Sequence, residues 1–258
     1  MNEVKKLLAT IEFNDKEKEM PIFEEWISFN GADKCYEILN NLKELVITNK
    51  INFVDLINFS NYELKLSEIL FTLLRIQENH VKAFLSNTFD DYQVQIEARP
   101  SNYSKTKYYF KIPVGVNEYL DIRTFNYEEG PVDYYDAIKT IDFGDINLIM
   151  FHLPNYLIKK FSQNPDILDD LDKTRKLRNY VYHHNILFSL GKKELLNALT
   201  LTLRNLPYRR QRKEYIEKIN RLRFSGVVSK KDIGSNIAIT INDNLAKEII
   251  DFTSLDTF

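Results

Sequence analysis

The sequence predicts a mainly α-helical protein. Glycine and proline, the residues that most often interrupt helices, number only seven each in 258 residues, below their average usage. Apolar residues recur every three or four positions in several long segments, with lysine and glutamate between them, as in amphipathic helices. Apolar residues make up 44% of the chain, enough for a substantial core. A β-sandwich or a Rossmann-type domain would use more glycine in its turns and phosphate loops.

Two helices are expected before residue 90. In residues 33–47 the apolar positions, Cys35 among them, follow helical spacing. Residues 63–87 form the longest predicted helix, with a broad apolar stripe. Cys35 is the only cysteine, which excludes an internal disulfide and a cysteine-based zinc site, and we expect it to be inert in the core.

The segment 89–136 lacks a sustained helical period, is rich in tyrosine, and contains Pro113 and Pro131. We expect an irregular insert with a short strand at 107–112. Its tyrosines could stack on bases or pack in a core or interface.

Helical periodicity returns at 143–161, where Pro154 interrupts it and Asp145 is the expected N-cap. Further helices are expected at 166–188, 192–206, 209–224 and 243–252.

The isoleucines of 235–241 alternate as in a strand. We expect a helical extension at 1–62, a helical domain at 63–225 that includes the insert, and a strand-and-helix tail at 226–258.

The charge balance does not favour indiscriminate coating of nucleic acid, because the net charge is −2 and the pI is about 6.1. Any RNA binding must come from local charge segregation. The N-terminus does not resemble a signal peptide, and no window of 18 apolar residues predicts a membrane helix. We therefore expect a cytoplasmic protein without membrane association.

One segment, 204–223, is locally basic, with eight basic residues and two acidic ones. Its candidate phosphate contacts are Arg209, Arg210, Arg212 and Lys213. Tyr208 and Tyr215 could stack on unpaired bases. A solvated helix face explains the same pattern equally well.

The segment with the clearest chemical pattern is 175–186, RKLRNYVYHHNI. Four residues separate Arg178 from His183, and Asn179 follows the arginine. The spacing alone is common. It also fits an ordinary amphipathic helix in which Arg178 pairs with Asp172 and His183 lies near the helix end.

The flanking residues make the pattern more specific. LRNYVYHHNILF at 177–188, together with TIDFGDINLIMF at 140–151, resembles the HEPN superfamily, and most closely its Abi-like abortive-infection family. The resemblance covers about 63–206. It implies a HEPN-type helical bundle, homodimerisation, and a metal-independent toxin ribonuclease that needs no cofactor. It also implies an RNA substrate, and by family analogy a protein or noncoding-RNA antitoxin.

The resemblance assigns the catalytic roles to Arg178, Asn179 and His183, whose chemistry suits RNA cleavage. RNA carries its own nucleophile, the 2′-OH, so cleavage requires proton transfer and stabilisation of the phosphorane charge. Histidine titrates near neutral pH and can accept or donate the protons. Arginine stays charged and matches phosphate oxygens, while Asn179 could orient the histidine or bind the phosphate. The products would be a 2′,3′-cyclic phosphate and a 5′-OH.

Helix geometry bears on how these residues meet. On an ideal helix Asn179 and His183 share a face, whereas Arg178 and His183 lie about 140° apart. A symmetric dimer could bring two copies of the motif together across one cleft.

Two further residues have alternative interpretations. Glu78 could pair with Arg178 and hold its guanidinium, or form an ordinary surface pair with Lys82. His184 could be a second catalytic histidine or a structural one.

Three other functions were compared with the sequence. The HEPN toxins silenced by nucleotide transfer to tyrosine carry R-x4-H-x-Y. Here Asn185 stands in the tyrosine position, so the modified tyrosine is missing and the sequence does not support this alternative. A non-catalytic HEPN module that binds RNA or protein, and a purely structural helical protein, stay open as alternatives.

Overall fold

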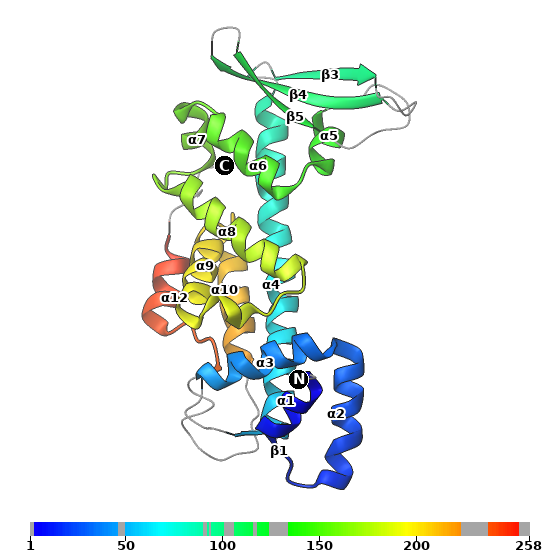
Figure 1. Cartoon of the computed structure of the whole chain (residues 1–258). Coiled ribbons are helices and arrows are strands. Elements are labelled where there is room, and N and C mark those ends of the chain that lie inside the picture. The colour runs from blue at the N-terminus through cyan, green and yellow to red at the C-terminus, as the bar shows by residue number, and fades with distance from the viewer. Residues whose placement is uncertain are drawn as a thin grey trace. The chain divides into compact units, whose positions relative to one another are not determined.

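The computed structural model describes residues 3–45, 50–89, 92, 94–100, 106–115, 118–123, 134–222 and 237–252. It is mainly helical with minor strands, which confirms the predicted fold class at that level (Figure 1). None of the helices in these ranges is long and apolar enough to cross a membrane.

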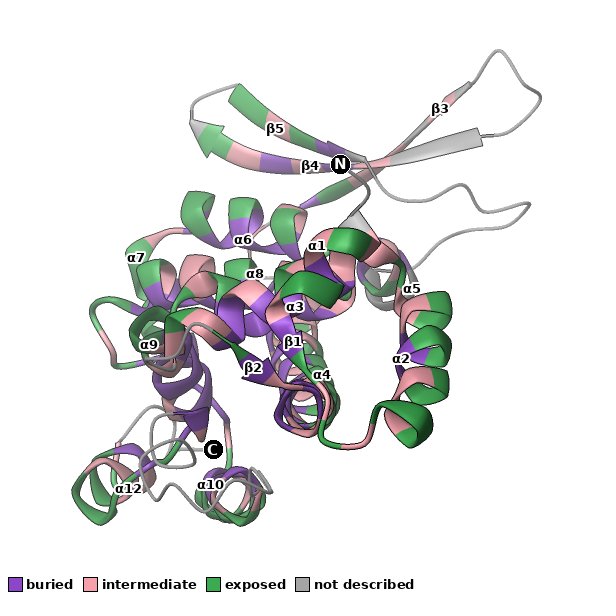
Figure 2. Ribbon diagram, turned by 60° about the horizontal axis from the view of Figure 1, so that its bottom comes forward, coloured by how far each residue is buried: buried purple, intermediate pink, exposed green. Residues whose placement is uncertain are grey.

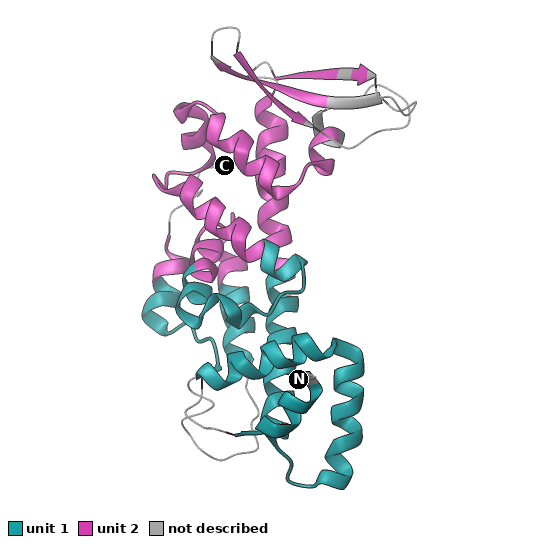
Figure 3. Cartoon of the chain, viewed as in Figure 1, with its two compact units in different colours: residues 1–71, 179–197, 213–247 teal, residues 72–178, 198–212, 248–258 magenta. Residues whose placement is uncertain are grey.

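The chain forms two compact units, each built from several segments (Figure 3). Unit 1 comprises residues 1–71, 179–197 and 213–247, and unit 2 comprises 72–178, 198–212 and 248–258. These units differ from the three consecutive regions expected from the sequence, because several helices continue from one unit into the other. The longest of them, α4, spans Phe53–Phe89 and runs through residue 62 without a break.

Unit 1 begins with three helices and a pair of very short strands. The elements are α1 (Glu3–Thr10), β1 (Ile11–Glu12), α2 (Lys16–Asn30), α3 (Ala32–Leu45) and β2 (Ile51–Asn52), with β1 parallel to β2. Asp15 caps α2 by accepting the Lys18 N–H at 3.3 Å. The rings of Phe13, Phe23 and Phe53 pack together in the core.

Cys35 is buried in this core, as predicted. Burial raises the pKa of its thiol to about 12, because a thiolate would lose its hydration there. The thiol is therefore unreactive at neutral pH.

The isoleucines of the tail are buried, but the described part of 235–241 forms no strand. Their backbone groups bond to side chains instead. The Ile239 N–H donates to the Tyr62 hydroxyl at 2.8 Å, and the Ile241 N–H donates to Asn220 Oδ1 at 2.9 Å. The strand prediction is wrong here because side chains, and not a neighbouring strand, accept the hydrogen bonds of these backbone N–H groups.

Unit 2 contains an antiparallel sheet where the sequence suggested an irregular insert. Its strands are β3 (Gln95–Pro100), β4 (Thr106–Gly115) and β5 (Glu118–Arg123), in the order β3-β4-β5. The predicted strand at 107–112 lies within β4. Buried and more exposed positions alternate along β4, as expected of a sheet with one solvated face (Figure 2). The register shifts between Pro113 and Gly115, a position where a strand tolerates proline.

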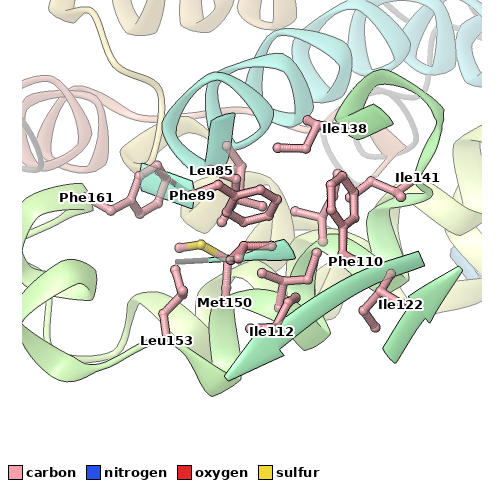
Figure 4. Close-up of a cluster of buried hydrophobic side chains, with 14 of the residues drawn as sticks. Leu85, Phe89, Phe110, Ile112, Ile122, Ile138, Ile141, Met150, Leu153 and Phe161 are labelled. Carbon is pink, nitrogen blue, oxygen red and sulfur yellow. The ribbon is translucent and has the colours of Figure 1, made fainter. Parts of the chain in front are cut away.

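The buried face of this sheet packs on helices of the same unit. Phe110, Ile112 and Ile122 lie against Leu85 and Phe89 of α4 (Figure 4). Met150 of α6 (Phe143–His152) belongs to the same cluster. The neighbouring helices are α5 (Tyr134–Thr140), α6 (Phe143–His152) and α7 (Asn155–Phe161).

Pro154 separates α6 from α7, as predicted. The N-cap of α6, however, is Asp142, which accepts the Asp145 N–H at 2.9 Å. Asp145 lies inside the first turn, where a carboxylate suits the helix dipole.

The remaining helices largely follow the predicted ranges. They are α8 (Ile167–Tyr182), the 3-10 helix η1 (Leu187–Leu190), α9 (Lys192–Arg204), α10 (Arg209–Arg221) and α12 (Asp243–Ile250).

Candidate active site

The motif lies at the C-terminal end of α8, which stops at Tyr182 and not at residue 188 as predicted. Two backbone hydrogen bonds just after Tyr182 end the helix. The His184 N–H donates to the Val181 carbonyl at 3.2 Å, and the Asn185 N–H donates to the Tyr180 carbonyl at 2.9 Å. This pattern defines a Schellman motif with His183 at the C-cap.

His184 occupies the left-handed position of that motif, with φ of +53°. Glycine is usual there, because a side chain costs about 1–2 kcal/mol in this conformation. Among the described residues His184 is the only non-glycine with positive φ. The structure thus gives His184 a role in the turn that ends the helix.

His183 and Asn179 belong to one helical turn. The His183 N–H donates to the Asn179 carbonyl at 3.0 Å. The His183 side chain is exposed and the Asn179 side chain is half-buried. The predicted histidine is therefore accessible to a substrate, and it lies at the point where the helix ends.

Arg178, one position before Asn179, lies in a mostly buried charge cluster of unit 2. Its Nε is 3.7 Å from Glu78 Oε2, and the other carboxylate oxygen, Oε1, is 2.9 Å from Lys82 Nζ. The side chains of Arg178 and Glu78 are only 18% and 12% exposed. Glu78 thus contacts both expected partners, Arg178 and Lys82, but the pair with Lys82 is largely buried and not on the surface. Glu78 therefore lies between two cations.

Asp172, the alternative partner of Arg178, is paired elsewhere. It accepts from Arg175 at 2.8 Å and lies 3.3 Å from Lys176 Nζ. The Arg175 hydrogen bond lowers the pKa of this carboxyl.

The predicted RNA-binding residues of α10 differ in accessibility. Arg209, Arg210 and Lys213 are exposed, and Arg209 pairs with Asp251 at 2.6 Å. Tyr208 is exposed, whereas Tyr215 is buried. Of the two tyrosines, only Tyr208 is accessible for stacking.

Arg212 is the exception, because its residue is only 2% exposed. It donates to the Leu206 carbonyl at 2.9 and 3.0 Å, to the carbonyls of Ile249 and Ile250 at the end of α12, and to the Phe252 carbonyl just beyond it. Arg212 therefore caps a helix C-terminus, and the prediction that it meets phosphates is wrong.

Two aromatic residues beside the motif were not anticipated. The rings of Phe71 and Tyr182 stack at 4.7 Å with an interplanar angle of 27°. Phe71 lies off the buried stripe of α4, which includes Leu70, Leu73 and Leu74. An aromatic residue outside an amphipathic stripe is the only signal that the sequence offers for it.

Among the described residues no group of three histidine, cysteine, aspartate or glutamate side chains is placed to hold a metal ion. No family model, curated protein or solved structure matches this chain.

Proposed function

We propose that this protein is a metal-independent endoribonuclease of the abortive-infection, HEPN type. The observation that carries the proposal is the end of α8, where an exposed histidine follows an arginine whose Nε lies 3.7 Å from a buried carboxylate. Arg178 can stabilise phosphorane charge, and His183 can transfer protons. The sequence resemblance to Abi-like proteins points to the same residues and to cytoplasmic RNA as the substrate.

The reaction requires no external reactant. The ribose 2′-oxygen attacks the adjacent phosphorus, and a histidine accepts the proton of the hydroxyl group. The bond from phosphorus to the 5′-oxygen breaks, and a protonated histidine donates to that oxygen. The products are a 2′,3′-cyclic phosphate and a 5′-OH end, and Arg178 offsets the charge on the phosphorane between these steps.

Arg178 and His183 have to act at the same phosphate. We propose a homodimer in which His183 of one copy works beside Arg178 of the other. Helix geometry supports this arrangement, because five residues along a helix turn the side chains about 140° apart. A closed two-fold dimer brings both copies of one segment to the same axis.

The test uses purified protein and single-stranded RNA in buffer with EDTA. The wild type should leave cyclic-phosphate ends, and Arg178→Ala or His183→Ala should abolish cleavage. Lys176→Ala, an exposed cation on the same helix, is the matched control and should cleave normally. If both motif variants cleave like the wild type, the proposal is wrong.

Mixing the two inactive variants tests the shared site. A dimer of one Arg178→Ala chain and one His183→Ala chain retains one intact site, with His183 from the first chain and Arg178 from the second, and should recover cleavage. Failure to recover, or a monomer by light scattering, contradicts the shared site.

If the wild type binds RNA without cutting it, the protein is a non-catalytic RNA-binding module. A restraining antitoxin, protein or RNA, should relieve the toxicity of the wild type.

A further inference from the structure

A stacked aromatic pair lies directly beside the candidate catalytic histidine. Phe71 and Tyr182 both belong to unit 1, as does His183. Their ring centroids are 4.7 Å apart, and among the described aromatic pairs this is the stacked one, the others being tilted or edge-on. The pair belongs to the surface, because Phe71 is 42% exposed.

We infer that Phe71 and Tyr182 form a platform on which an unpaired base of the RNA substrate stacks. This inference rests on the proposed ribonuclease function and deepens it, because it names what positions the substrate. Aromatic side chains bind unpaired bases by stacking, and every base offers a π-face.

The position of the platform suits the reaction. Tyr182 and His183 are consecutive residues, so their Cα atoms are about 3.8 Å apart. Because the pair and His183 lie at the same end of α8, the inference places the ribose of the stacked nucleotide, with its 2′-OH, at His183. The nucleotide on the 5′ side of the cleaved bond is therefore the one bound. Double-stranded RNA should be a poor substrate, because its bases are already stacked.

The proposed dimer brings His183 close to its partner copy, but the ring pair itself offers too little apolar surface to form the centre of that interface. A standard interface buries about 800 Å² on each partner around an apolar centre. The large exposed apolar residues of α4 here are Leu64 and Phe71, and the exposed Glu68 lies between them. A single pair of stacked rings offers enough surface for one base to stack on.

The first test compares cleavage of a single-stranded RNA by three variants. Phe71→Leu keeps an apolar side chain but removes the ring, and it should lower kcat/KM about 5- to 150-fold, mainly through KM. Phe71→Trp, with a larger ring, should cleave at least as well as the wild type. Leu64→Ala, at the other exposed apolar position of α4, should change nothing. Because Phe71 is partly exposed, all three should unfold at nearly the wild-type temperature.

The second test measures binding without cleavage, in a His183→Ala background. One RNA is intact, and the other carries an abasic ribose 5′ to the cleavage position. The abasic RNA should bind about 5- to 150-fold more weakly, and Phe71→Leu should remove this difference.

The outcomes separate the two proposals. If Phe71→Leu leaves cleavage and base-dependent binding unchanged, the platform is overturned while the ribonuclease stands. Base-dependent binding that needs Phe71, in a protein that never cleaves, supports the platform and ends the ribonuclease proposal. If Phe71→Leu and Leu64→Ala both change the oligomeric state, the surface contacts protein and the platform is overturned.

Discussion

Arg178 Nε lies 3.7 Å from Glu78 Oε2, although the two residues are 100 positions apart in the chain. The carboxylate also contacts Lys82 at 2.9 Å, so it is the common anchor of two largely buried cations. This relationship predicts that Glu78 positions Arg178 without touching the substrate itself.

Glu78→Gln should therefore reduce both activity and stability. The variant removes the charge that holds the guanidinium, and we expect kcat/KM to fall by up to about 100-fold. Loss of the buried negative charge beside Arg178 and Lys82 should cost roughly 1–3 kcal/mol in the free energy of unfolding. RNA cleavage and urea unfolding measure the two effects. Lys82→Gln, which keeps the contact of Glu78 with Arg178, should affect cleavage much less, and equal losses in both variants would contradict the positioning role.

His184→Gly should stabilise the protein and leave cleavage intact. Glycine adopts the left-handed conformation without strain, although it also adds freedom to the unfolded chain, so the net gain should be up to about 1 kcal/mol. Thermal unfolding and RNA cleavage are the measurements. A large loss of cleavage in this variant would show that the His184 side chain takes part in the chemistry.

Arg212→Met should destabilise the fold rather than weaken RNA binding directly. The substitution leaves buried carbonyls at Leu206 and Phe252 without their charged donor, which should cost roughly 3 kcal/mol or more. Arg210→Met changes an exposed residue of the same helix and should stay within about 0.5 kcal/mol of the wild type. Denaturant unfolding of both variants tests the assignment, which a stable Arg212→Met protein would refute.

Arg210→Gln and Lys213→Gln test the exposed face of α10. If these cations meet phosphates, each substitution should reduce the slope of log binding constant against log salt concentration by about 1. Lys159→Gln, on α7, is the control. Unchanged slopes would show that the face is merely solvated.

Glu63 should make stability depend on pH. Its carboxylate is buried and accepts the Phe188 N–H at 2.8 Å, and burial raises its pKa to about 7. Since the folded state then holds a proton that the unfolded state releases near pH 4.5, this contribution is complete below that value and is lost as pH rises toward 7. The loss is up to about 3 kcal/mol.

Glu63→Gln keeps an acceptor for the Phe188 N–H but cannot ionise. It should be more stable than the wild type at pH 8 and about equally stable at pH 4.5, as measured by the Tm of both proteins across this range. A constant difference between the two proteins would show that Glu63 does not titrate as described.

Sequence periodicity was sufficient for most of the longer helices, because the 3.6-residue repeat is a local property of the chain, but it did not locate α1, α2 or α5. It located the helices of the second half and the break at Pro154. It was less informative where backbone groups find partners outside their own element. The sheet of residues 95–123 and the side-chain bonds that hold Ile239 are examples.

For the candidate site, too, some features follow from the sequence and others only from tertiary packing. The sequence by itself determined that Arg178, Asn179 and His183 fall within two turns, since their spacing fixes that in any helix. Only the tertiary structure decided which carboxylate holds Arg178, that Arg212 is buried, and that Phe71 stacks beside the histidine. These features depend on which distant segments pack together, and a one-dimensional repeat carries no record of that.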